Sequence, residues 1–189
     1  MAGVSSPMRR VPARWRQFAV GLVLGGATGG LVTGLSILVL GSVLAKVGRH
    51  LTDSLLLGLV AVLGVADVLG RTPHIGRQVP QRFVSLLPPG QLGFVWGTDL
   101  GLVWTTQKTT SGLWVAFAGL AVVKPLAAPV AVVMLSILSS SAALILGRVA
   151  AHKGRVPSLE YLAQGRRARR IVGVLELAMV FAGLASLTA

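Results

Sequence analysis

The stretch Phe18–Ala45 reads FAVGLVLGGATGGLVTGLSILVLGSVLA and contains no charged residue. A helix of this length would extend about 42 Å, whereas the hydrocarbon core of a bilayer is about 30 Å thick. Basic residues precede it, because Arg9, Arg10, Arg14 and Arg16 lie within the first 17 positions. A secretory signal peptide has an apolar core of only about 7–15 residues. We therefore interpret this run as a retained membrane helix.

The composition of the whole chain indicates the same environment. Hydrophobic residues make up 53% of the 189 residues and charged residues 12%, whereas soluble domains carry about 25% charged residues. We therefore predict an all-α membrane bundle of five or six transmembrane helices. It would comprise a basic cytoplasmic N-terminus (1–17) and a single transmembrane domain (18–189). Besides the first span at 18–45, the expected spans are 51–70, 93–123, 126–147 and 171–188.

The charges are strongly asymmetric, with 18 Lys and Arg against 5 Asp and Glu. No separate basic domain exists, so we expect no nucleic-acid partner. If each span crosses once from a cytoplasmic N-terminus, segments 1–17, 71–92 and 148–170 face the cytoplasm and hold 14 of the 18 basic residues. The positive-inside rule therefore favours an odd number of crossings, with a six-crossing arrangement still open. Anionic head groups of a bacterial plasma membrane are the expected neighbours of these basic loops.

Two spans are longer than a single straight crossing requires, and both contain residues that weaken helices. The first has glycine pairs at 25–26 and 29–30, and the third has the polar stretch TTQKTTSG at 105–112. Glycine costs helix stability, and Thr and Ser side chains compete for backbone hydrogen bonds. A broken helix at membrane depth requires protein or water to satisfy its freed backbone groups. The alternatives are a long tilted helix or, in the third span, a tight hairpin at 107–112.

Glycines and short matching blocks suggest further organisation. The four-residue spacing of Gly21, Gly25 and Gly29 favours close packing of membrane helices. An internal repeat at an offset of 76–77 residues would relate the two halves of the chain. Its matching blocks are Phe18, Gly21, Leu24, Gly25 and Thr33 with Phe94, Gly97, Leu100, Gly101 and Thr109, then 69–71 with 146–148, and 79–80 with 156–157.

Three acidic residues lie inside apolar spans: Asp67, Asp99 and Glu176. A carboxylate at the centre of a membrane helix costs at least about 2.5–3.5 kcal/mol, so each should face protein or water. In the five-crossing arrangement all three lie near the basic surface and would form a layer that couples to protons or binds a cation. The alternative is that each pairs with a neighbouring arginine such as Arg71 or Arg170.

The polar interruption of the third span is the expected solute path. Lys108 stands within it, either as part of a substrate-anion or gating site or in water on a short external loop. No nucleophile and base, phosphate loop or metal motif is present, and the chain has no cysteine. We therefore expect no enzymatic activity, no catalytic residue, no cofactor and no metal. The predicted substrate-lining residues are Thr105, Thr106, Gln107, Lys108 and Thr109.

The third span reads Phe94-x-x-Gly97 and then Trp104-Thr105-Thr106-Gln107. This resembles the transmembrane cytochrome c biogenesis and thiol-disulfide interchange family (the CcdA and DsbD type), in which a Phe-x-x-Gly helix leads into Trp-Thr-Pro-Cys at a helix break. That family belongs to a wider group that includes LysE-type transporters. The resemblance implies inverted three-helix halves with broken first helices. Because Thr106-Gln107 replaces Pro-Cys, it implies a divergent, cysteine-less member without thiol redox activity.

The function that these patterns favour is transport of a small solute or ion. The alternative is a non-catalytic membrane scaffold or anchor subunit of a larger complex. Short loops and close-packing glycines are compatible with such a subunit. Membrane proteins or a second copy of the chain would then be the partners.

Overall fold

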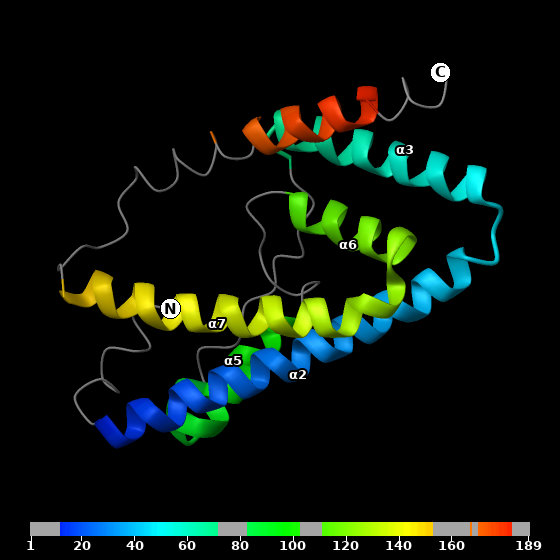
Figure 1. Cartoon of the computed structure of the whole chain (residues 1–189). Helices are drawn as coiled ribbons and strands as arrows, with labels where there is room; N and C mark the ends of the chain where they lie inside the picture. The colour runs from blue at the N-terminus through cyan, green and yellow to red at the C-terminus, as the bar shows by residue number, and fades with distance from the viewer. Residues whose placement is uncertain (1–11, 72–82, 103–110, 153–166, 168–169, 183–189) are drawn as a thin grey trace. The chain divides into compact units, whose positions relative to one another are not determined.

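The computed structural model describes residues 12–71, 83–102, 111–152, 167 and 170–182 (Figure 1). All elements in these ranges are helical, which confirms the all-α prediction for this part of the chain. The number of crossings and the internal repeat stay predictions. The elements are α2 (Pro12–Leu44), α3 (Arg49–Val68), α4 (Phe83–Leu86), α5 (Pro89–Gly101), α6 (Gly112–Val123), η2 (Pro125–Ala127), α7 (Ala128–His152) and a final helix at 170–182.

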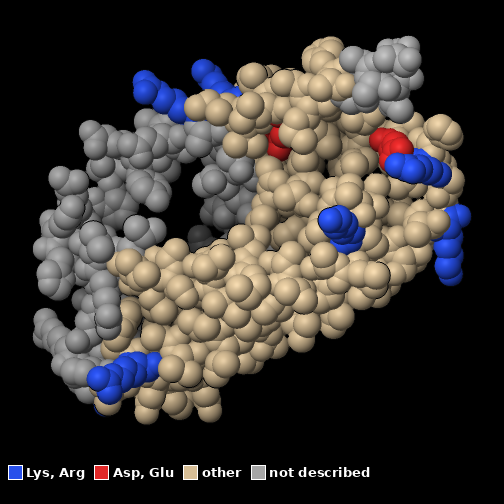
Figure 2. Space-filling model, viewed as in Figure 1, with Lys and Arg blue, Asp and Glu red and all other residues tan. Residues whose placement is uncertain are grey.

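Three helices of the described part are long and apolar enough to cross a membrane. They cover Ala13–Leu44, Arg49–Val68 and Pro125–Ile145, and a shorter apolar helix covers Gly112–Val123. Most of the described surface in Figure 2 is uncharged. Large apolar side chains are exposed on these helices, whereas Thr33, Asp67, Ser111 and Glu176 are buried. Polar groups inside and apolar groups outside are typical of a protein whose solvent is lipid.

The chain divides into two compact units. Unit 1 comprises residues 1–36, 75–106 and 129–156, and unit 2 comprises residues 37–74, 107–128 and 157–189. Helix α2 contributes to both units.

Helix α2 is continuous through both of its glycine pairs. The first span therefore adopts the long-helix alternative, and the broken first helix that the family resemblance implies for this half is wrong. The helix also starts at Pro12, inside the segment expected to be a basic tail, so Arg14 and Arg16 lie on its first turns. Its glycines do not break the helix because they are used in packing against other helices.

Within unit 1, α2 and α5 run parallel with their backbones in direct contact (Figure 1). A Cβ added to Gly21 would collide with the carbonyl oxygen of Gly90, and one added to Gly25 would collide with that of Phe94. Gly29 has the same relation to Thr98. The packing role predicted for the three α2 glycines is thereby confirmed. The glycines of α5 that approach the α2 backbone in return are Gly93, Gly97 and Gly101.

Helix α7 runs antiparallel to α2 on another face of the same unit. Gly26 lies against Ser140, and Gly30 lies against Ser136. The buried cluster at the start of α2 comprises Trp15, Phe18, Leu22 and Leu92. In this cluster the rings of Trp15 and Phe18 are 5.9 Å apart.

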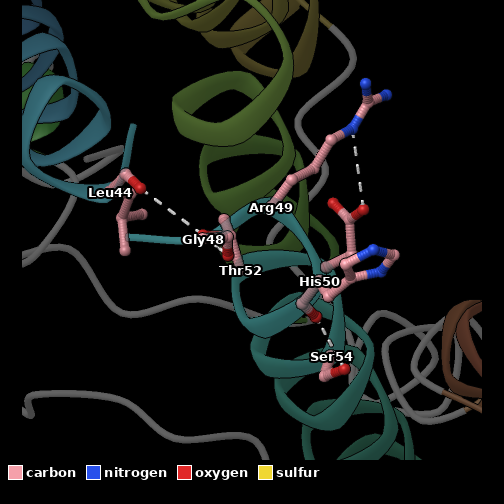
Figure 3. Close-up of polar contacts among 7 residues, drawn as sticks. Leu44, Gly48, Arg49, His50, Thr52 and Ser54 are labelled. Atoms are coloured by element: carbon pink, nitrogen blue, oxygen red, sulfur yellow. Dashed lines mark hydrogen bonds and ion pairs between the residues drawn. The ribbon is translucent and has the colours of Figure 1, made fainter. Parts of the chain in front are cut away.

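Unit 2 contains the turn that joins α2 to α3 (Figure 3). The hydroxyl of Thr52 lies 3.4 Å from the carbonyl oxygens of both Leu44 and Gly48, which ties the first turn of α3 to the end of α2. Arg49 and Asp53 form an ion pair at 3.9 Å. Both side chains are exposed, so this pair contributes little to stability.

The third expected span is interrupted in the structure. Helix α5 ends at Gly101 and α6 begins at Gly112, whereas a single straight helix would have continued between them. Helix α6 ends at Val123, and Pro125 begins the short helix η2, so the chain turns between the expected spans 93–123 and 126–147.

Candidate functional site

The last carbonyl group of α5 accepts a hydrogen bond from a side chain of another helix. Thr33 on α2 donates a hydrogen bond of 3.0 Å to the carbonyl oxygen of Gly101, the last residue of α5. The last carbonyls of a helix have no partner within the helix. The hydroxyl of Thr33 therefore provides a hydrogen-bond donor for a carbonyl group that has no partner within α5, because the helix ends at Gly101.

The start of α6 is satisfied in a comparable way within unit 2. Ser111 precedes α6 and does not cap it with its own side chain. Its backbone N–H instead donates a hydrogen bond of 2.8 Å to Oδ2 of Asp67 on α3. A carboxylate at a helix N-terminus interacts favourably with the helix dipole, by about 0.3–1 kcal/mol at the surface and up to about 2 kcal/mol where it is partly buried. Asp67 thus acts as the cap of α6.

The side chain of the same serine meets a second acid. Its Oγ lies 3.1 Å from Oε1 and 3.0 Å from Oε2 of Glu176, and 3.4 Å from the carbonyl oxygen of Leu63. A hydroxyl carries one proton and donates one hydrogen bond, while it accepts others. When Ser111 donates to Leu63, its contact with Glu176 needs a proton on that carboxyl. Rotation of one hydroxyl therefore accommodates both protonation states of Glu176.

All three side chains are shielded from the surroundings. Asp67 and Ser111 have no exposed surface, and Glu176 is 3% exposed. Two glycines allow this closeness, because Gly64 on α3 and Gly173 on the helix at 170–182 lie against each other. A Cβ at Gly173 would lie 2.7 Å from the carbonyl oxygen of Gly64. The glycine contact thus lets Glu176 approach α3 and the start of α6.

The three acids predicted as a cation- or proton-coupling layer are placed as follows. Asp67 and Glu176 are brought together on Ser111 in unit 2. Asp99 is half-buried on α5 in unit 1, and its relation to the other two is not defined. Among the described residues, no Lys or Arg forms an ion pair with Glu176. The coupling role of the three acids stays a prediction.

The predicted substrate-lining residues lie outside the described part of the chain. They are Thr105, Thr106, Gln107, Lys108 and Thr109.

Two residues of the site were not predicted from the sequence, Thr33 and Ser111. Ser111-Gly112 stands directly before an apolar run, which is a pattern typical of a helix start and could have identified Ser111. Thr33 carries no such pattern, since its partner Gly101 is 68 positions away.

The donor atoms at Ser111 are two carboxyl groups and one hydroxyl. Within the described ranges, no group of three or more His, Cys, Asp and Glu is arranged to hold a metal ion. Two carboxyls at a buried hydroxyl are suited to a proton or a monovalent cation. No known protein family, curated protein or solved structure matches the chain. A function is therefore assigned from the chemistry of these residues.

Proposed function

We propose that this chain is a multi-pass protein of the bacterial plasma membrane that moves a small solute or ion, and that Asp67, Ser111 and Glu176 form its proton-exchange site. The observation that carries the proposal is the convergence of two buried carboxyls, from two helices, on Ser111, the residue directly before α6. Ionisable residues at membrane depth are costly and mark ion pathways and proton relays.

The polarity of the site supports a proton or cation rather than an anion. The N–H of Ser111 is already occupied by Asp67, so this group of α6 is not free to receive an anionic solute. Glu176 adds a second acidic group. Like charges in one buried site repel each other, and a bound proton or cation relieves that repulsion.

Proton exchange would act on α6 through Ser111. Loss of the proton from Glu176 directs the Ser111 hydroxyl towards the carboxylate, whereas gain of the proton frees that hydroxyl for Leu63. The protonation state thereby selects the hydrogen bond at the N-terminal end of α6. The predicted substrate-lining residues directly precede this position in the sequence, which is how proton exchange would couple to solute movement.

We also propose that the chain is a cysteine-less relative of the CcdA and DsbD type, within the LysE-like group. Phe94 and Gly97 lie on α5, and that helix ends at Gly101, three positions before Trp104. An interruption at this point supports the resemblance. It leaves the internal repeat and the crossing number as predictions.

The test is proton flux into vesicles that contain the purified full chain and a pH-sensitive dye. A potassium diffusion potential would drive protons, with and without alkali cations and small amino acids as candidate solutes. We expect Glu176→Gln and Asp67→Asn to abolish the flux. Asp53→Asn is the matched control, because Asp53 is an exposed acid on the same helix as Asp67, and it should retain the flux.

Undiminished flux through Glu176→Gln would refute the proton-exchange site. If the wild-type chain carried no flux and instead co-purified with a membrane complex, the scaffold or anchor subunit would be the correct function.

A further inference from the structure

Two apolar hollows flank a single ridge on α2, and both lie within unit 1. The larger, about 740 Å³, lies between α2 and α5 and is lined by Gly21, Gly90 and Phe94 among others. The smaller, about 330 Å³, lies between α2 and α7 and is lined by Ala19 and Ile145 among others. Arg16 and Val20 line both hollows. Because they are four residues apart on one helix, they form a ridge with a hollow on each side.

The head of this ridge is positively charged. Arg16 is exposed there, and neither α2 nor α5 has an acidic residue in its first turn. The two helices run parallel, so their N-termini lie at the same end of the pair. Helix N-termini carry partial positive charge and bind phosphate groups through free N–H groups. Gln17 and Gln91 are polar residues that also line the larger hollow.

We propose that unit 1 binds one diacyl anionic phospholipid of the surrounding bilayer, with its phosphate on Arg16 and one acyl chain in each hollow beside Val20. Guanidinium groups bind phosphate with paired, charge-assisted hydrogen bonds. Val20 lies one turn further into the apolar part of α2 than Arg16, as the chains of a lipid lie below its head group. Two hollows with one shared cation match a ligand with two chains and one phosphate.

The inference rests on the membrane placement in the proposed function and is independent of transport. The inference specifies one lipid molecule bound at Arg16. A general attraction between basic loops and anionic head groups would instead affect neighbouring arginines equally.

The experiment is native mass spectrometry of the purified full chain in detergent, titrated with phosphatidylglycerol or with phosphatidylcholine of the same chains. We expect one phosphatidylglycerol per chain and weaker binding of phosphatidylcholine. Arg16→Gln should weaken the binding of phosphatidylglycerol about tenfold or more, because a hydrogen-bonded charge pair is lost. Arg14→Gln removes the same charge two residues away, at a position that lines neither hollow, and should change the affinity little.

A second pair of variants tests the two-chain fit. Ile145→Trp fills the smaller hollow and should weaken the diacyl lipid but not its single-chain lyso form. Leu138→Trp is the control, since Leu138 is as exposed on the same helix and lines neither hollow. Equal losses from Arg16→Gln and Arg14→Gln, equal affinity for both lipid classes, or no effect of Ile145→Trp on the diacyl lipid would each overturn the proposal. Such a result with proton flux intact would leave the proposed function standing.

Discussion

Asp67 accepts a hydrogen bond of 2.8 Å from the backbone N–H of Ser111, and so an acid of α3 caps the start of α6. Buried helix ends need partners for their free N–H groups. Here the partner comes from a different helix, and a second acid, Glu176, holds the side chain of the same serine. The position of α6 in unit 2 therefore depends on the chemistry of two carboxyl groups.

Substitutions of Asp67 separate its charge from its role as a cap. Asp67→Asn keeps an acceptor for the N–H of Ser111, whereas Asp67→Leu removes it and leaves that N–H buried without a partner. We expect Asp67→Leu to destabilise the protein by about 1–3 kcal/mol, and Asp67→Asn to cost less. Thermal unfolding in detergent, followed by circular dichroism, measures the difference. Equal stability of the two variants would contradict the capping role.

Thr33 has a corresponding role at the end of α5. Thr33→Val preserves the shape of the side chain but removes the hydrogen bond to the carbonyl oxygen of Gly101. The expected loss is about 1 kcal/mol of stability, with faster amide exchange in the last turn of α5. Thr33→Ser keeps the hydroxyl and is the control. If Thr33→Ser and Thr33→Val exchange at the same rate, the hydrogen bond does not hold this helix end.

The glycines of α5 should be intolerant of a single methyl group. In Gly97→Ala the added Cβ would collide with the carbonyl oxygen of Leu22. Overpacking of this kind costs about 1–3 kcal/mol. Gly58→Ala is the matched control, since nothing lies within 4 Å of a Cβ built there. Alanine favours helices over glycine, so this variant should be as stable as the parent or more so. Chemical unfolding of both variants decides the point.

The number of crossings is open to a labelling experiment in a chain that has no native cysteine. The five-crossing arrangement places residues 1–17 and 148–170 on the same side of the membrane. Ser5→Cys and Glu160→Cys should then react with a membrane-impermeant maleimide from the cytoplasmic side alone. Labelling of the two positions from opposite sides would indicate six crossings. The unsubstituted chain should remain unlabelled in either case.

Much of the helical structure could be predicted because apolar length is a strong constraint. The run 51–70 became α3 within two residues at each end, and the polar stretch at 105–112 coincides with the gap between α5 and α6. The continuity of α2 could not be predicted from local sequence. Glycine weakens an isolated helix. In α2, however, the absence of side chains at the glycines lets α5 and α7 approach closely, and this packing stabilises the helix.

The site was predictable only in part. Burial of Asp67 and Glu176 follows from the cost of a carboxylate in lipid, so both were recognised as unusual. Their meeting at Ser111 depends on the approach of Gly64 to Gly173, and no local pattern indicates which glycines of distant helices will touch. The sequence marks Ser111 as a candidate helix start, but its two acidic partners lie on other helices, and only the packing of those helices brings them to it.

The contact between α2 and α5 has a mechanical consequence. Each helix presents its glycines every four residues, so sliding one helix along the other by four residues, about 6 Å, brings glycines opposite the partner backbone again. Complementary shape alone cannot distinguish these registers. Thr33 does not recur at that interval, and its hydrogen bond to the carbonyl oxygen of Gly101 selects one register. This hydrogen bond therefore supplies the register information that the regular glycine spacing lacks.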